Sequence, residues 1–151
     1  MLSVRLLRRC APRNDNTFMP CIFCKIIAGE IPSYKVYEDE QVLAFLDINP
    51  VNPGHTLVVP KKHLANIEEA DEETLCRIMR IVKKVGESLK KKLGAPGYNV
   101  QENNDPAAGQ VVPHLHFHIV PRLEQDGLAL WPQKQYEENE AVEILNKIKI
   151  N

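Results

Sequence analysis

Histidine alternates with large apolar residues in Pro113-His114-Leu115-His116-Phe117-His118-Ile119-Val120. Successive side chains of a β-strand point to opposite faces, so this pattern predicts three imidazoles on one face. Leu115, Phe117 and Ile119 then form the other face, which we expect to pack on a helix. Neighbouring imidazoles would lie about 7 Å apart, which is two residues of strand rise.

The rest of the chain surrounds this stretch with four more strand-like runs and one long helix. The other runs are 34–37, 42–46, 55–59 and 98–103, and the histidine strand is expected over 111–120. Asp71 is a suitable N-cap for the helix and Gly94 a suitable stop. Its apolar residues recur every three or four positions: Leu75, Ile78, Met79, Val82, Val85, Leu89 and Leu93.

Short helices are expected at both ends of the domain, near residues 21–28 and around Val142, Leu145 and Ile148. Strands lie before and after the long helix without a regular strand–helix–strand alternation. The sequence therefore predicts an α+β fold with a five-stranded, mostly antiparallel sheet, one long helix and short terminal helices.

Composition excludes several classes of protein. The 151 residues suit one domain, and 19 basic against 20 acidic residues give a net charge of −1. No apolar run approaches the ~18 residues of a membrane span. We therefore expect no membrane and no nucleic-acid partner, and with only four cysteines the chain suits a reducing compartment, the cytoplasm.

The first 18 residues differ from the remainder. Residues 1–18 hold four arginines and one aspartate, a net charge of +3, which leaves −4 for the rest of the chain. An Arg-rich, acid-poor opening fits a transit peptide, which would make the protein mitochondrial. The alternative is an upstream extension, with Met19 as the true start. In either case we expect a disordered leader over 1–18 and a single domain over 19–151.

Three explanations of the histidine row compete. Three satisfied structural histidines at a spacing of two residues would be unusual. A catalytic metal site is possible because two histidines separated by one residue on a strand can reach the same ion. Covalent catalysis is the third, with one imidazole attacking while its neighbours orient it. Spacing alone does not separate the last two.

Cys21 and Cys24 have the spacing that lets two thiolates share one metal ion. A redox pair would need a strand–helix context that this chain lacks. A closed zinc site requires two more ligands, and His63, which follows Pro60-Lys61-Lys62, is either one of these or an exposed loop histidine. Cys76 is expected to be a small packing residue of the long helix.

The stretch Gly109–Arg122 resembles the signature of the histidine triad superfamily, which is histidine, apolar, histidine, apolar, histidine and two apolar residues. Matching elements precede it in order at 21–27, 45–50 and 53–63, so the resemblance covers roughly residues 20 to 125. It is nearest to the histidine-triad nucleotide-binding branch with its zinc-type bacterial members.

The resemblance implies roles for all five histidines. His116 corresponds to the nucleophile that attacks the α-phosphorus of a nucleotide and forms a covalent nucleotidyl-histidine. His118 is implied to hold the phosphate oxygens, and His55 to orient the triad. In zinc-type members the metal is held by residues matching Cys21, Cys24, His63 and His114. Four protein ligands leave no open position, so this zinc would be structural.

The resemblance also implies nucleotide contacts. Asp47 corresponds to a ribose-binding acid, and the less favoured alternative is a cap for the Asn49-Pro50 turn. The phosphate loop would contain Asn103, Gly109 and Gln110. The base would lie against Phe23, Ile27, Phe45 and Leu46, which are also plausible core residues. Val111 departs from the serine of several relatives, which leaves the leaving-group preference open.

The expected activity is hydrolysis of purine nucleoside phosphoramidates, with acyl-adenylates as further substrates. Hydrolysis of dinucleoside polyphosphates is the alternative within catalysis. A nucleotide-binding regulatory module with vestigial activity is the alternative outside it. The resemblance further implies a homodimer in which two sheets join into one of ten strands, and it implies no organic cofactor.

Overall fold

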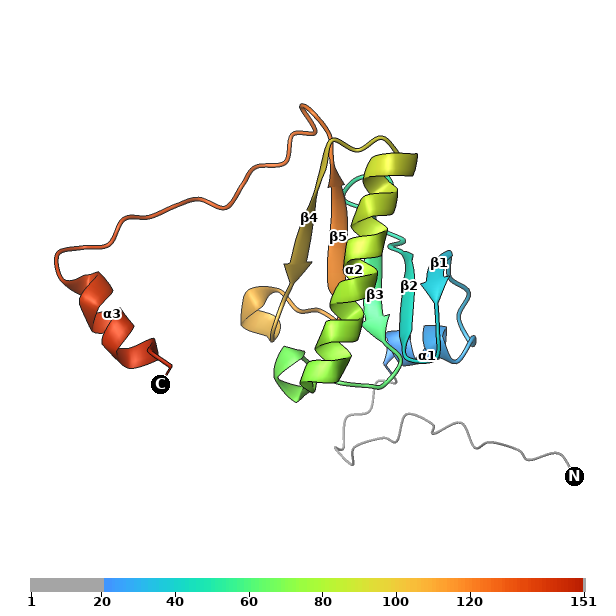
Figure 1. The fold of residues 1–151 in the computed structure, drawn as a ribbon, viewed down its shortest axis with the longest axis horizontal. Coiled ribbons are helices and arrows are strands. Elements are labelled where there is room, and N and C mark those ends of the chain that lie inside the picture. The colour runs from blue at the N-terminus through green and yellow to red at the C-terminus, as the bar shows by residue number, and fades with distance from the viewer. Residues whose placement is uncertain (1–20, 151) are drawn as a thin grey trace, which may run out of the picture.

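The structure, a computed structural model, describes residues 21–150. The expected leader over 1–18 and the alternative start at Met19 lie outside this range. Figure 1 shows one long helix lying across a sheet, with the C-terminal segment extending away from both.

Five strands form the sheet in the order β1-β2-β3-β5-β4. Their bounds are β1 Lys35–Glu38, β2 Val42–Leu46, β3 Thr56–Pro60, β4 Gly97–Glu102 and β5 Phe117–Arg122. All four strand pairings are antiparallel, which confirms the predicted fold class.

The helices have the bounds α1 Ile22–Ile27, α2 Glu72–Lys92 and α3 Glu140–Ile148, and two short 3₁₀ turns are Ile67–Glu69 and Pro106–Ala108. The Asp71 carboxylate accepts a hydrogen bond from the Thr74 N–H at 2.8 Å, which confirms the predicted N-cap of α2. In the described part of the chain no helix is long and apolar enough to cross a membrane.

Both faces of the sheet are covered, and β2 shows how the sequence achieves this. Val42 and Ala44 join the cluster under α2, while Leu43 and Phe45 join a second cluster that contains Phe23 and Ile26 of α1. Since alternate residues of β2 point to opposite faces, its continuous apolar run is buried on both sides, as predicted.

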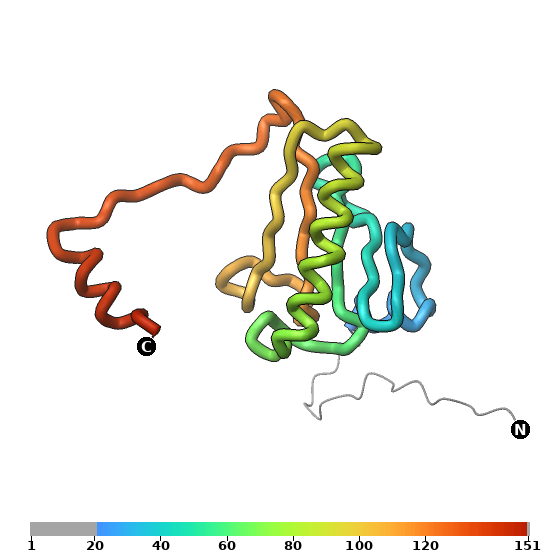
Figure 2. Tube along the Cα trace, in the orientation of Figure 1, coloured from blue at the N-terminus to red at the C-terminus, as the bar shows by residue number. Residues whose placement is uncertain are grey.

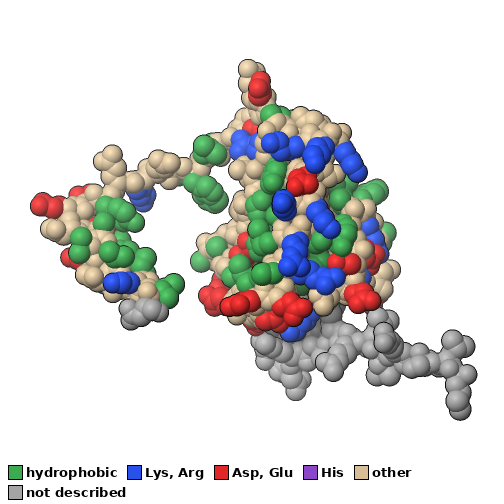
Figure 3. Space-filling model, in the orientation of Figure 1, with side chains coloured by type: hydrophobic (Ala, Val, Ile, Leu, Met, Phe, Trp, Pro, Cys, Tyr) green, Lys and Arg blue, Asp and Glu red, His purple; other side chains and the backbone are tan. Residues whose placement is uncertain are grey.

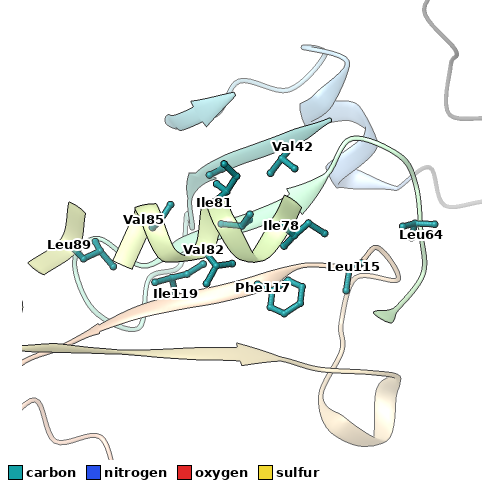
Figure 4. Close-up of a cluster of buried hydrophobic side chains, with 12 residues drawn as sticks. Val42, Leu64, Ile78, Ile81, Val82, Val85, Leu89, Leu115, Phe117 and Ile119 are labelled. Atoms are coloured by element: carbon teal, nitrogen blue, oxygen red, sulfur yellow. The ribbon is translucent and has the colours of Figure 1, made fainter. Parts of the chain in front are cut away.

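The larger core cluster lies between α2 and the sheet (Figure 4). Ile78, Val82, Val85 and Leu89 face it as predicted, together with Ile81. Two expected core residues were wrong: Met79 is 45% exposed because it lies at the edge of the apolar stripe, and Leu93 is 52% exposed because it follows the last helical residue. Cys76 is likewise exposed rather than packed.

The histidine strand is shorter than predicted, because β5 begins at Phe117 and not at Val111. Pro113 has no N–H to donate, and the Leu115 N–H bonds to the Leu64 carbonyl at 2.7 Å rather than to β3. The alternation nevertheless survives. Leu115, Phe117 and Ile119 all lie in the core under α2, so the predicted apolar face is confirmed.

Candidate functional site

The histidines gather on the face of the sheet that α1 covers. The ring centroids of His116 and His118 lie 4.9 Å apart, and the Phe23 ring of α1 meets His116 edge-on at 5.2 Å. His116 and His118 lean closer together than the strand rise predicts. His114, which precedes β5, turns toward α1 and the cysteines.

His116 has one ring nitrogen committed to the backbone. Its Nδ1 lies 2.6 Å from the His114 carbonyl oxygen. Since a carbonyl can only accept, Nδ1 carries the proton and the neutral ring keeps its lone pair on Nε2. This fixes a single tautomer with a basic Nε2.

A chain of hydrogen bonds also fixes the tautomers of His55 and His118. The Val51 N–H donates to Nδ1 of His55 at 3.3 Å, so Nε2 of His55 carries the proton. That Nε2 lies 2.9 Å from Nδ1 of His118 and donates to it. The remaining nitrogen of His118, Nε2, is therefore an N–H donor.

Burial keeps these rings neutral. It lowers the pKa of His118 to about 4, with smaller contributions from the nearby His116 and His55. Burial also lowers the pKa of His116, although the hydrogen bond to the His114 carbonyl and the Asp47 charge oppose the shift. At neutral pH the site thus offers an uncharged imidazole whose lone pair is available for attack.

Asp47 follows β2 and lies beside His55, with 3.6 Å between Oδ2 and Nδ1 of His55. This separation is too long for a hydrogen bond. Oδ1 of Asp47 accepts from the Asn49 N–H at 2.8 Å, so the carboxylate does cap the turn, as one of the two interpretations predicted. Asp47, His55 and His118 place ligand atoms within 4.8 Å of one another.

The predicted phosphate loop follows β4 and leads to the histidines. Gly109 has a φ of +92°, the left-handed region that favours glycine, and it ends the 3₁₀ turn over 106–108. Gln110 is buried, and its side chain accepts from the Asp105 N–H at 2.9 Å and donates to the Ala65 carbonyl at 2.7 Å. Gln110 therefore holds the loop in shape through its side chain. Asn103 accepts from the Gln101 side chain at 2.9 Å.

The residues expected around a base lie at α1 and the end of β2. Phe23 and Phe45 are buried and meet edge-on at 5.7 Å, while Ile27 and Leu46 are half-buried. Phe23 and Phe45 belong to the smaller core cluster, which confirms the core interpretation, while their contact with a base stays a prediction.

Cys21, Cys24, His63 and His114 form a second cluster, whose ligand atoms all lie within 4.8 Å of one another. Nδ1 of His114 is 3.4 Å from the Cys21 sulfur and 3.7 Å from the Cys24 sulfur. Nδ1 of His63 is 3.3 Å from the Cys24 sulfur. A tetrahedral zinc with ordinary bond lengths separates sulfur and nitrogen ligands by about 3.6 Å, so this donor set fits zinc.

The backbone prepares His114 for a metal. Its Nε2 donates to the Pro60 carbonyl at 2.9 Å, which leaves Nδ1 unprotonated and directed at the cysteines. A carbonyl that fixes the second nitrogen of a ligand histidine is typical of metal sites. Burial lowers the pKa of His114 to about 4, so the neutral form required of a ligand predominates.

Sequence reasoning missed the backbone groups that set these tautomers. The Val51 N–H and the carbonyls of Pro60 and His114 act through main-chain atoms. Because every residue carries such groups, residue type gives no signal for them.

Comparison with protein families matches residues 28–125 to the HIT domain. The chain belongs to the histidine triad (HIT) family. Among relatives of this HIT protein, an uncharacterized HIT-like protein of Methanocaldococcus jannaschii is 63% identical over 107 residues, 71% of this chain and 82% of the relative. The adenosine 5′-monophosphoramidase of Schizosaccharomyces pombe is 45% identical over 137 residues, 87% of this chain and 100% of the relative.

Solved structures of HIT proteins share the fold. A HIT family protein of Bacillus subtilis superimposes with a TM-score of 0.78 at 44% identity, over 85% of this chain and 94% of that one. A zinc-bound histidine triad family protein of Mycobacterium smegmatis has a TM-score of 0.70 at 34% identity, over 87% of this chain and 99% of that one.

Proposed function

We propose that this HIT protein hydrolyses purine nucleoside 5′-phosphoramidates through a covalent nucleotidyl intermediate on His116. The proposal rests above all on the hydrogen bond from Nδ1 of His116 to the His114 carbonyl. It gives the ring one lone pair, on Nε2, and burial favours the neutral form that can attack.

The reaction has two displacements. Nε2 of His116 attacks the α-phosphorus, the bond from phosphorus to the leaving nitrogen breaks, and the departing amine takes up a proton from the solvent. Water then attacks the same phosphorus and returns a proton to the solvent, the bond to His116 breaks, and nucleoside 5′-monophosphate leaves. Dividing one difficult step into two is the advantage of a covalent route.

His118 and His55 are positioned to support both displacements. The Nε2–H of His118 is the free donor at the end of the Val51–His55–His118 chain of hydrogen bonds. We assign it to an oxygen of the α-phosphate, where a fixed donor stabilises the charge that develops in the transition state. His55 acts through His118, as a positioning residue.

The nucleoside would extend from the histidines toward Asp47 and α1. One oxygen of Asp47 caps its turn, which leaves Oδ2 to accept from the ribose hydroxyls. Phe23, Ile27, Phe45 and Leu46 supply an apolar wall for the base. The Asn103–Gln110 loop would approach the phosphates through its backbone, since the side chain of Gln110 is already engaged.

The choice of a phosphoramidate follows from the related adenosine 5′-monophosphoramidase, which matches along its whole length. Dinucleoside polyphosphates are the alternative substrates. Val111 is 90% exposed and offers no hydroxyl to assist a leaving group.

Two experiments test the activity together. Rates on adenosine 5′-phosphoramidate and on a diadenosine polyphosphate identify the preferred leaving group, and acid-free mass spectrometry of quenched reactions detects an adenylyl adduct. We expect a higher kcat/KM on the phosphoramidate, an adduct on wild-type protein and none on His116→Asn. His118→Gln, which keeps the nucleophile, should still form the adduct but more slowly.

Each other outcome overturns part of the proposal. A higher rate on the dinucleotide would identify the alternative hydrolase. Binding of nucleotide without turnover of either substrate would identify a regulatory module. An adduct that persists in His116→Asn would remove His116 as nucleophile.

We further propose a structural zinc held by Cys21, Cys24, His63 and His114. Bound there, zinc would cross-link α1 to the loop after β3 and to the histidine stretch. Ligation by two reduced thiolates suits a reducing compartment such as the cytoplasm. The edge strand β4, with Val100 43% exposed, is the surface through which we expect two sheets to pair in a homodimer.

A further inference from the structure

The C-terminal arm, residues 123–150, leaves the domain and ends in α3 without folding back on it (Figures 1 and 2). From residue 129 to 150 every residue is exposed except Ile144, which is half-buried. Beyond Leu128, the hydrogen bonds among the described residues of the arm all lie within the arm. Neither the fold nor the proposed active site accounts for this segment.

The root of the arm is nevertheless firmly held. Arg122, at the end of β5, donates to both carboxylate oxygens of Asp126, at 2.7 and 2.9 Å, and to the Leu128 carbonyl at 2.8 Å. Asn52 ties the same turn to the body, donating to the Pro121 carbonyl at 2.9 Å and to Asp126 at 3.1 Å. A bidentate Arg–carboxylate pair fixes direction as well as distance, so the direction in which the arm leaves the domain is fixed.

The helix at the end of the arm has an apolar face without a partner among the described residues 21–150. Val142, Leu145 and Ile148 are 58%, 55% and 69% exposed, and their spacing of three places them on one side of α3. Figure 3 shows the apolar side chains gathered along this helix. An isolated helix shorter than about 12 residues is marginal in water, so the nine residues of α3 require a surface to pack on.

The body of the domain offers a matching surface between α2 and β1, which we call the α2–β1 groove. One half is apolar, with walls formed by Val36, Leu46, Val85, Leu89 and Leu93. Val36 and Leu93 are 45% and 52% exposed. The other half, toward the N-terminus of α2, is basic and is lined by Arg77, Arg80, Lys83 and Lys84. Lys and Arg side chains are seen along α2 in Figure 3.

Charge gives the direction in which α3 would lie in this groove. Four acids, Glu137, Glu138, Glu140 and Glu143, lie before α3 or in its first turn, and the apolar residues Leu145 and Ile148 follow. Arg77 is already paired with Asp39, and the groove acid Glu87 lies 3.8 Å from Lys91, so the groove keeps a basic excess at Arg80, Lys83 and Lys84. A helix parallel to α2 brings acid against base and apolar against apolar.

We propose that α3 occupies the α2–β1 groove of a second copy of this chain. The arm passes the β4 edge and continues away from β1, the strand that forms the groove of its own domain (Figure 1). Because the first residues of the arm are held by Arg122 and Asn52, α3 lies away from the groove of its own domain. It points toward the position of a second copy of the chain paired at β4. Two arms exchanged in this way form an isologous contact, in which each chain gives a helix and receives one.

Disulfide trapping tests the proposal on the full-length chain, without reference to nucleotide hydrolysis. Two chains of different size, each with one introduced cysteine, are mixed. One carries Leu145→Cys and the other Leu93→Cys, both in a Cys10→Ser and Cys76→Ser background that retains Cys21 and Cys24. Zinc is kept present to protect Cys21 and Cys24, and glutathione buffer supplies the oxidant. The matched control replaces Leu145→Cys by Lys147→Cys, on the opposite face of α3.

A cross-linked species of the summed mass, formed with position 145 at least several-fold more than with position 147, is the expected result. No excess over the control overturns the proposal. A chain that carries both cysteines and forms only an internal disulfide also overturns it, because α3 would then lie in its own groove.

Sedimentation provides the second measurement. Leu145→Ser should raise the dimer dissociation constant at least tenfold. Lys147→Ser, which introduces serine on the opposite face of α3, should change the constant by no more than about twofold. Equal effects of the two substitutions, or none from either, contradict the proposal.

Discussion

Replacing His118 with glutamine should make the folded protein less sensitive to acid. The buried ring has a pKa of about 4 in the native state, against about 6.5 for an unperturbed histidine. Between these values the unfolded chain binds a proton that the native protein does not. Stability from this group is therefore complete above about pH 6.5 and is lost as the pH falls toward 4.

The size of the effect follows from the shift. A difference of about 2.5 pKa units corresponds to roughly 3 kcal/mol once the pH is below both values, and to about 2 kcal/mol at pH 5. His55, which donates to Nδ1 of His118 at 2.9 Å, can still donate to the amide oxygen of a glutamine. The glutamine variant thus removes the titration while retaining an acceptor.

Urea unfolding of zinc-loaded wild type and His118→Gln at pH 7.5 and pH 5 measures the difference. The wild type should lose about 2 kcal/mol more of its free energy of unfolding than the variant over this interval. Any acid loss of the metal occurs in both proteins and cancels. Losses equal within about 0.5 kcal/mol would refute the argument, as would an NMR titration of the His118 ring with a pKa near 6.5.

Three further predictions concern α2, the proposed phosphate loop and the proposed zinc. Gly86→Ala should lower the free energy of unfolding by about 1–2 kcal/mol in urea titrations, because the new Cβ would clash with the ring of Tyr98. The gain in helix propensity offsets only part of that strain. An unchanged unfolding midpoint would contradict this prediction. Gln110→Ala should lower the free energy of unfolding by about 1–3 kcal/mol, since the Ala65 carbonyl and the Asp105 N–H lose their hydrogen-bond partner. It should also raise KM more than it lowers kcat. An unaltered KM would show that the loop does not depend on this side chain. Removing zinc with a chelator should lower the melting temperature by at least about 5 °C, and restoring zinc but not magnesium should recover it; a melting temperature insensitive to chelation would exclude a structural metal.

The hydrophobic pattern predicted most of the fold because burial is recorded in residue type. The uninterrupted apolar run 42–46 predicted a strand covered on both faces, and β2 has these bounds and this burial. The stripe through Ile78, Val82, Val85 and Leu89 predicted the packed face of α2. Errors occurred at Leu93 and at the start of β5, where hydrogen bonding and not polarity sets the end of an element, and at Met79, which lies at the edge of the apolar stripe of α2.

The side chains that gather at the candidate site were predicted from the sequence, but the orientation of their rings was not. The sequence indicated which imidazoles would be neighbours, and His116 and His118 are in ring contact. Which nitrogen of each ring carries a proton depends on backbone atoms brought from other elements, such as the Val51 N–H at His55. Such atoms have no residue-specific signature, so the tautomers became known only with the three-dimensional arrangement.

His114 connects the proposed zinc site to the proposed nucleophile. Its ring has Nδ1 directed at the cysteines and Nε2 bonded to the Pro60 carbonyl, while its own carbonyl accepts the Nδ1 proton of His116 at 2.6 Å. Displacing the ring of His114 would turn its peptide group, and Nδ1–H of His116 would lose the acceptor that fixes its tautomer. A metal that takes no part in the chemistry would therefore still affect the rate. If His114 holds the proposed zinc, the first histidine of the triad would contribute to catalysis through its backbone and to stability through its side chain.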